Sequence, residues 1–82
     1  LKRKAIPLMN AATYAIECTS KYAEKKNIVV VAEVETNFII NANPDQLNQV
    51  VLNLVENAIK YTPAGGRVWI RSGNRGAFSV SD

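Results

Sequence analysis

The sequence predicts an α+β fold, a two-layer sandwich in which helices pack on one face of a mixed sheet. Two segments, 7–26 and 43–61, repeat apolar residues with helical spacing. The region between them is rich in β-branched residues, which favour strands. After the second helical segment, 67–71 and 77–81 alternate as strands do and are joined by a turn. No internal repeat or domain boundary interrupts this order.

Length and composition indicate one small domain. The chain has 82 residues, of which 48% are hydrophobic and 21% charged. A domain of this size buries only about 60% of the surface that its unfolded chain exposes, so we expect a thin core and a tendency to self-associate. The net charge of +3 comes partly from a basic start, Lys2–Lys4, and from Lys25 and Lys26 near a helix end. Solvated termini and helix dipoles explain such charges, and no nucleic-acid binding is expected.

The cysteine and histidine content limits which disulfides and metal sites the chain can form. The chain has one cysteine, Cys18, and no histidine, which excludes an internal disulfide and a Cys/His zinc site. We expect Cys18 to be a small packing residue of the first helix. The chain has no apolar run near 18 residues and no signal-peptide pattern, so we expect a soluble segment without direct membrane contact.

The first elements follow from local signals. Residues 1–6 are predicted to be a linker or an edge strand. Pro7 suits a first helical turn, and the helix is predicted to run to Lys26 and stop at Asn27. The residues that follow helical spacing in this segment are Leu8, Ala11, Ala12, Ala15, Thr19, Tyr22 and Ala23.

Two β-branched segments follow the first helix. Residues 28–34 change from continuous apolar to alternating, and Asn37 separates them from 38–40. Strands that lie close in sequence and are separated by a turn residue commonly pair with each other. We therefore predict a hairpin between the two helices.

The second helix has a clear start. Asn43 is a candidate N-cap, Pro44 fits the first helical position, and Asp45 is favourable near the positive helix end. The helix is predicted to end near Tyr61, before a stop and turn at 62–66. Its buried stripe is predicted to contain Leu47, Val50, Val51, Leu54, Val55, Ala58 and Ile59.

Polar residues lie beside that stripe. Asn53 and Asn57 are one helical turn apart, and Lys60 follows on the same side. Two stacked amides can present their oxygens to one small polar object such as a hydrated cation. Spacing alone leaves a second interpretation open, in which both amides mark the solvent boundary of an amphipathic helix.

A longer pattern resembles a known family. Residues 45–63 resemble the N-box helix of the ATP-binding domain of sensor histidine kinases. Residues 65–70 are similar to the strand that follows that helix, and 78–82 to the strand leading into the adenine-binding Asp of the first glycine box. The resemblance extends from about residue 6 and implies the Bergerat-type fold shared with DNA gyrase, MutL and the ninety-kilodalton heat-shock chaperone. It implies that residues 7–82 are the N-terminal, truncated portion of such a domain.

The resemblance implies a role for each matching residue. Asn57 matches the amide that coordinates magnesium on the ATP phosphates, and Asn53 matches the one near the same metal. Lys60 matches a basic residue that approaches the phosphates, and Tyr61 an aromatic position near the nucleotide. Asp82 matches the acceptor of the adenine amino group. The implied cofactors are ATP and Mg²⁺. A second interpretation remains open for each of the last two residues. Tyr61 could be a half-buried ring that closes the helix end, and Asp82 could be an ordinary charged terminus.

One position separates kinase from hydrolase chemistry. Gyrase-like and MutL-like enzymes carry a general-base Glu where this chain has Asn53. An amide has no useful basicity at neutral pH, which disfavours water activation. Glu56 lies about 100° around the helix from Asn57 and is expected to be a solvated charge. Phosphoryl transfer by positioning and charge neutralisation is the preferred interpretation, and no catalytic residue is assigned.

These inferences predict the ATP-binding part of a two-component sensor histidine kinase. The resemblance implies that the acceptor is a histidine on a separate dimerisation domain. Because this chain has no histidine, the 82 residues alone are expected to be inactive. A response regulator is the second implied partner. The expected location is the cytoplasm, either in a cytoplasmic protein or in the cytoplasmic part of a membrane-bound sensor. Alternatives are a protein serine kinase or ATPase of the same fold, or a non-enzymatic interaction fragment.

Overall fold

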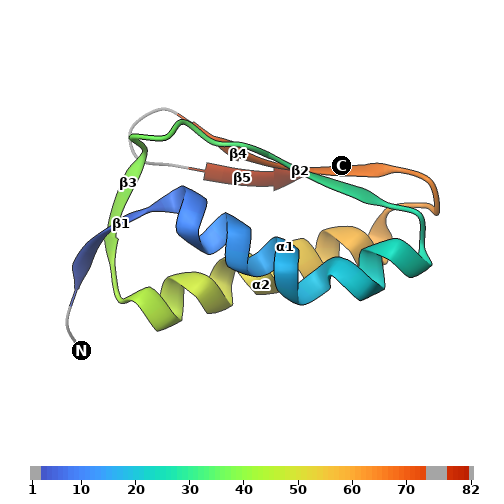
Figure 1. Ribbon diagram of the computed structural model, residues 1–82, viewed down its shortest axis with the longest axis horizontal. Coiled ribbons are helices and arrows are strands. Elements are labelled where there is room, and N and C mark those ends of the chain that lie inside the picture. Colours follow the sequence, from blue (N-terminus) through green and yellow to red (C-terminus); the bar gives the residue numbers. More distant parts are fainter. Residues whose placement is uncertain (1–2, 74–77, 82) are drawn as a thin grey trace.

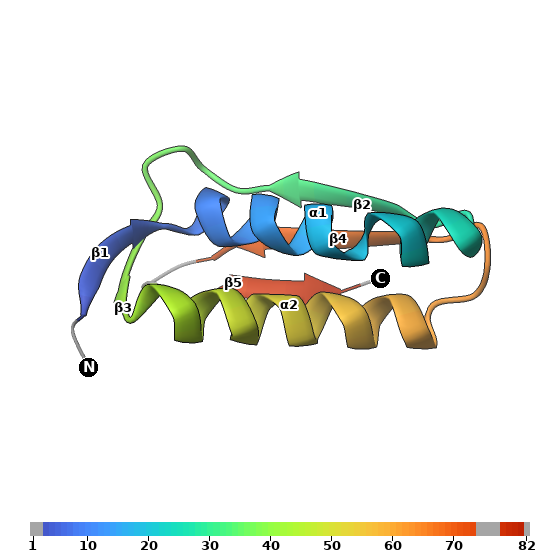
Figure 2. The same cartoon turned by 60° about the horizontal axis from the view of Figure 1, so that its bottom comes forward.

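Two helices lie side by side beneath a sheet in the computed structural model, which describes residues 3–73 and 78–81 (Figures 1 and 2). The elements in chain order are β1 (Lys4–Pro7), α1 (Leu8–Lys25), β2 (Val29–Glu33), β3 (Ile39–Ala42), α2 (Pro44–Tyr61), β4 (Arg67–Ser72) and β5 (Phe78–Ser81). Both helices cover the same face of the sheet and contact each other along their length. The predicted α+β class, with helices on one face of a mixed sheet, is confirmed.

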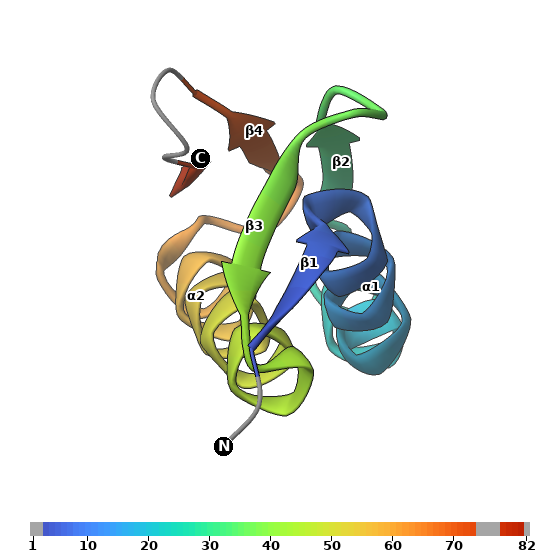
Figure 3. The ribbon, with the colours of Figure 1, turned by 90° about the vertical axis from the view of Figure 1, so that its left-hand side faces the viewer.

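The main sheet has the strand order β2-β4-β5. Strand β2 runs parallel to β4, with Val29 opposite Arg67, and β5 runs antiparallel to β4, with Val80 opposite Ile70. Strands β1 and β3 form a separate antiparallel pair at one end of the helices (Figure 3). The predicted antiparallel pair after the second helix is therefore present.

The predicted hairpin between the helices is wrong, because β2 and β3 belong to different sheets. The Leu8 amide donates to the Phe38 carbonyl at 2.9 Å and extends the β1–β3 pair. The Val29 amide donates to the Gly66 carbonyl at 3.2 Å, where the β2–β4 pairing begins. Each strand thus takes a partner far away in sequence, which a local pattern does not reveal.

Helix α1 begins one residue later than predicted. Pro7 has an extended backbone (φ −62°, ψ 128°) and ends β1, so it precedes the helix as its N-cap. At the other end, Asn27 adopts a left-handed φ of 54°. Its amide donates to the Glu24 carbonyl and the Ile28 amide to the Ala23 carbonyl, a Schellman-type ending. The predicted stop at Asn27 is confirmed.

Helix α2 has the predicted bounds. The Asn43 side-chain oxygen accepts hydrogen bonds from the Asp45 amide at 3.0 Å and the Gln46 amide at 3.1 Å, and Pro44 is the first helical residue. After Tyr61 the backbone turns out of the helix, and Thr62 donates from its amide and its hydroxyl to the Ala58 carbonyl. Local sequence signals therefore place both ends of the helix that carries the candidate site.

The core lies between the helices and the inner face of the sheet. Small residues let α1 come close to its neighbours, since Ala11, Ala12 and Ala15 are all fully buried. The largest fully buried side chains are Leu8, Val51, Val55, Ile59, Val68 and Ile70. No helix in the part of the chain that the structure describes is long and apolar enough to cross a membrane.

Two predictions about burial are wrong. The buried row of α2 consists of residues four apart, Leu47, Val51, Val55 and Ile59, so it is narrower than the predicted stripe. Val50 and Leu54 lie beside that row and are 48% and 41% exposed. Cys18 is also exposed, because α1 turns the positions around Ala15 and Thr19 toward the core and Cys18 away from it.

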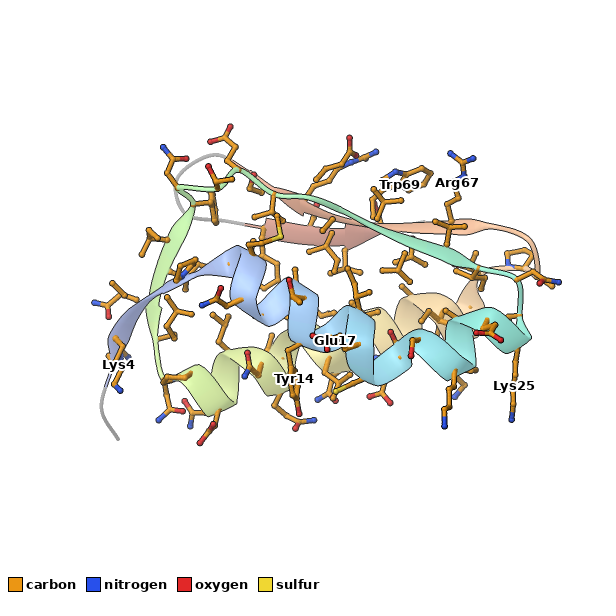
Figure 4. All side chains as sticks on the ribbon, viewed as in Figure 1. Lys4, Tyr14, Glu17, Lys25, Arg67 and Trp69 are labelled. Atoms are coloured by element: carbon orange, nitrogen blue, oxygen red, sulfur yellow. The ribbon has the colours of Figure 1, made fainter. Side chains whose placement is uncertain are left out.

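The outer face of the sheet carries polar and aromatic side chains. Arg67 and Trp69 point away from the helices (Figure 4). Arg71, further along β4, lies 5.0 Å from the centre of the Trp69 ring and forms an ion pair with Glu33 of β2 at 2.9 Å. This alternation explains why Val68 and Ile70, between the outward residues, reach the core.

Candidate functional site

A surface pocket of about 250 Å³ lies between the C-terminal half of α2 and strand β5. Helix α2 contributes one wall and β5 the other, and the lining residues are Leu54, Asn57, Ala58, Tyr61, Val80 and Ser81. The four helical residues have the spacing of a single face of a helix. The pocket is thus built from two elements whose relative position depends on the pairing of β5 with β4.

The chemistry of the lining is mixed. Leu54, Ala58 and Val80 provide an apolar surface, and Asn57, Tyr61 and Ser81 provide hydrogen-bonding groups. Sites for small organic ligands commonly combine a mainly apolar lining with a few polar groups that fix the orientation of the ligand. The pocket can therefore take a flat apolar group together with a polar extension.

The two amides predicted from spacing have different positions. Asn57 lines the pocket, whereas Asn53, one turn earlier, does not, and both side chains are exposed. The Asn53 oxygen accepts a hydrogen bond from the Gln49 amide group at 3.0 Å. A ligand in the pocket would therefore contact Asn57 directly, whereas Asn53 lies on the adjoining surface of the helix.

Lys60 and Tyr61 occupy the last turn of α2. The Lys60 ammonium lies 5.4 Å from the centre of the Tyr61 ring, within the range of a cation–π contact. Tyr61 is 74% exposed at the edge of the pocket, so the interpretation as a half-buried ring closing the helix is wrong. Lys60 is exposed and does not line the pocket, although its neighbour does.

Neither of the two carboxylates considered in the sequence is among the lining residues that the structure describes. Asp82 falls outside the described residues, and its predecessor Ser81 ends the β5 wall. Glu56 is exposed and is absent from the pocket lining. Across residues 3–73 and 78–81, no three or more His, Cys, Asp or Glu side chains gather in a way that could hold a metal ion.

Sequence reasoning missed four lining residues. The sequence predicts Leu54 and Ala58 in the buried stripe, and it predicts Val80 and Ser81 only as part of a strand. The signal that could have found the helical pair is the face shared by positions 54, 57, 58 and 61. The β5 residues carry no comparable signal, because their place depends on sheet pairing.

The segment that builds both pocket walls matches a protein family. Residues 42–82, half of the chain, match the family of histidine kinase-, DNA gyrase B- and HSP90-like ATPases. This chain belongs to that ATPase family. Membership in an ATPase family implies ATP binding, which agrees with a pocket that has both apolar and polar walls.

Curated proteins similar to this ATPase-family chain are sensor kinases. Over 45 residues, half of the chain, it is 49% identical to the adaptive-response sensory kinase SasA of Synechococcus elongatus. Over 75 residues, 88% of the chain, it is 39% identical to the sensor protein kinase PmrB of Pseudomonas aeruginosa. The chain spans 12% of the length of the first relative and 16% of the second.

Solved structures support the fold of this ATPase-family chain. The catalytic domain of histidine kinase ThkA superposes with a TM-score of 0.84, covering 98% of this chain and 57% of that one at 24% identity. The cytoplasmic segment of histidine kinase QseC gives a TM-score of 0.78, with 87% and 48% covered at 24% identity. At this identity the likeness concerns the fold.

Proposed function

We propose that this chain is the ATP-binding part of a sensor histidine kinase, in which Mg-ATP donates its γ-phosphoryl group to a histidine on a separate dimerisation domain. The observation that carries the proposal is the pocket in which Asn57 and Tyr61 of α2 face Val80 and Ser81 of β5. The sensor kinases among the similar proteins support the choice within the ATPase family.

The donor set of α2 fits magnesium. Mg²⁺ prefers oxygen ligands in an octahedron and keeps several waters, so one protein amide together with phosphate oxygens and waters can complete its coordination. Asn57, in the pocket wall, would supply that amide oxygen. Asn53, one turn earlier, would contact the metal or its waters, and Lys60 would offset phosphate charge at the helix end. The bound metal would neutralise charge on the phosphates.

The polar groups of the pocket favour transfer over hydrolysis. Activation of water needs a base, and no carboxylate lines the pocket within the described residues. Asn53, at the position where related hydrolases carry Glu, is an amide whose oxygen already accepts from Gln49. Positioning of the γ-phosphoryl group for another acceptor is therefore the activity that these residues serve.

The apolar wall suits the adenine ring. Leu54, Ala58 and Val80 offer the surface, and Tyr61 stands at the rim. We propose that Asp82, which follows Ser81 in the chain, accepts a hydrogen bond from the adenine amino group. Guanine presents a carbonyl oxygen at the equivalent position, so the carboxylate would select adenine.

The wider setting follows from the same proposal. Residues 7–82 would form the N-terminal portion of the ATP-binding domain, working in the cytoplasm with a histidine-bearing dimerisation domain and a response regulator. The second candidate is a serine kinase or ATPase of the same family, because the fold is common to these activities. A non-enzymatic interaction fragment is the third.

The decisive experiment follows the fate of the γ-phosphoryl group in the proposed full-length kinase that contains this chain, called the parent protein below. With γ-labelled Mg-ATP, we expect label to appear on the histidine-bearing domain faster than as free phosphate, in an acid-labile and base-stable form. Rapid phosphate release that needs no acceptor domain would identify an ATPase. Acid-stable label on protein would identify a serine kinase, and the absence of ATP binding would identify an interaction fragment.

A further inference from the structure

The side chain of Lys26 crosses from the end of α1 to the end of α2. Its ammonium donates hydrogen bonds to the carbonyl oxygens of Ile59 at 2.6 Å, Lys60 at 3.1 Å and Thr62 at 2.9 Å. These acceptors lie in the turn that also carries Tyr61 of the pocket wall. A single cation thus binds the backbone at the very end of the helix that forms the candidate site.

Together with Thr62, Lys26 provides hydrogen-bond donors to three of the last four carbonyls of α2. The last four carbonyls of a helix have no partner inside the helix. Thr62 donates to the Ala58 carbonyl from both its amide and its hydroxyl, and Lys26 serves the next two carbonyls, those of Ile59 and Lys60. A positive charge at this end also opposes the negative end of the helix dipole. Hydrogen bonds from an ammonium are stronger than those between neutral groups.

The backbone of Lys26 is held at the same place. Lys26 is the C-cap of α1, and the left-handed Asn27 that follows redirects the chain. The Lys26 carbonyl accepts a hydrogen bond from the Gly65 amide at 2.9 Å. Both the main chain and the side chain of one half-buried residue therefore attach the end of α1 to the connection after α2.

We infer that Lys26 is a positioning residue for the nucleotide site: it fixes the last turn of α2 so that Lys60 and Tyr61 meet the nucleotide. The inference rests on the proposed function, which gives those two residues their contacts. Asn53 lies two turns earlier, and the three hydrogen bonds of the Lys26 ammonium go to Ile59, Lys60 and Thr62, so we expect the contribution of Asn53 to binding to be independent of the cap. This difference within one helix makes the inference testable.

The first test replaces the ammonium without changing its neighbours. In the parent protein, Lys26→Met removes the three hydrogen bonds, and Lys25→Met removes the same charge from a side chain that extends away from the sheet (Figure 4). We expect Lys26→Met to weaken Mg-ATP binding by roughly tenfold, as for the loss of charge-assisted hydrogen bonds. Lys25→Met should stay within about twofold of wild type. Lys26→Arg keeps the charge but not the compact group with three donors, so it should recover only part of the loss.

A double-mutant cycle separates positioning from general destabilisation. If Lys26 acts through the last turn, Lys26→Met should weaken ATP binding much less in a Tyr61→Ala background than in wild type. In an Asn53→Ala background, Lys26→Met should weaken ATP binding by the same factor as in wild type. Equal losses in all three backgrounds would overturn the inference, because a general loss of stability would not depend on which ligand contact is present.

Hydrogen exchange gives a measurement that needs no nucleotide. We expect the amides around residues 60–62 to exchange faster in Lys26→Met than in Lys25→Met, with little change in the first turns of α2. Unchanged exchange there would overturn the inference even in a protein that binds ATP. A wild-type parent that fails to bind Mg-ATP while Lys26→Met speeds exchange would instead contradict the proposed function and leave the cap established.

Discussion

Gly66 stands so close to Thr62 that a β-carbon at Gly66 would lie 2.5 Å from the Thr62 methyl carbon. Thr62 is buried, and its hydroxyl donates to the Ala58 carbonyl at 2.6 Å, so it has little room to move away. The same turn makes two further backbone hydrogen bonds. The Gly65 amide donates to the Lys26 carbonyl, and the Gly66 carbonyl accepts from the Val29 amide. The absence of a side chain at Gly66 is thus a condition for joining α2 to β4.

Gly66→Ala should therefore destabilise the protein. We expect a loss of about 1–3 kcal/mol in the free energy of unfolding, the usual range for overpacking. Gly65→Asn is the matched control, since Gly65 has a left-handed φ of 88° but open space around it, and Asn tolerates that conformation. Denaturant unfolding of both variants measures the difference. A larger loss for Gly65→Asn would contradict this account of the turn.

Asn57 and Glu56 are neighbours in sequence with different expected effects on nucleotide binding. Asn57 lines the pocket, and Glu56 is exposed outside it. In the parent protein, Asn57→Ala should weaken Mg-dependent ATP binding by about tenfold or more, the effect of losing a contact to a charged ligand. Glu56→Ala should have little effect. Calorimetry with and without Mg²⁺ measures both, and equal losses would remove Asn57 from the site.

Tyr14 and Cys18 form a pair one turn apart on the exposed side of α1. A side-chain hydrogen bond with Cys18 raises the pKa of the Tyr14 phenol above 10.0, because it favours the protonated form. A raised pKa in the folded state stabilises the fold below the unfolded pKa, and this contribution disappears as pH rises through the folded value. Cys18→Ala should lower the pKa of Tyr14 and remove this contribution, which is present in the wild type at pH 7 and lost only as pH rises through the folded pKa.

Phenolate absorbance during alkaline titration measures that shift. Subtracting the curve of a Tyr14→Phe variant isolates Tyr14 from the other two tyrosines. An unchanged midpoint for Tyr14 in Cys18→Ala would show that the contact with Cys18 does not control its protonation.

The exposed apolar residues of α2 predict self-association of the 82-residue chain. Val50 and Leu54 are 48% and 41% exposed on one side of α2, and adjoining exposed apolar surface promotes association. We expect light scattering to report a mass above 9.0 kDa that rises with concentration. Val50→Lys should lower that mass, whereas Val29→Lys, at a more exposed position on β2, is the control. A monomer at all concentrations would contradict the prediction.

Local signals predict the helices far better than the sheet. The Asn43 cap, the Pro44 start and the Asn27 stop each depend on a few adjacent residues, and all three agree with the structure. The predicted hairpin failed because β2 pairs across the whole of α2 with β4. A β-branched strand carries its propensity in its own sequence, but the identity of its partner is set by how the helices pack.

At the candidate site, too, the local part was predictable from the sequence and the tertiary part was not. Helical spacing predicted that Asn53 and Asn57 share a side of α2, but only the placement of β5 decides that Asn57 faces a pocket. Lys26 illustrates the limit further. The sequence assigned its charge to the end of α1, and the structure adds that the ammonium reaches the carbonyls of α2. Contacts between helix ends depend on tertiary packing, which a single sequence does not display.

The parallel pairing of β2 with β4 also sets an order of events during folding. During synthesis β2 leaves the ribosome before α2, the turn at Gly66 and β4. Strand β2 therefore stays unpaired until β4 has been synthesised, because β4 is its partner. Helices form in about a microsecond, whereas pairing across a long loop is slower because the entropy of closing that loop is lost first. Trp69 is the single tryptophan and lies on β4 opposite Val31 of β2. Its fluorescence should therefore change in the slowest phase of folding, after helical circular dichroism has already appeared.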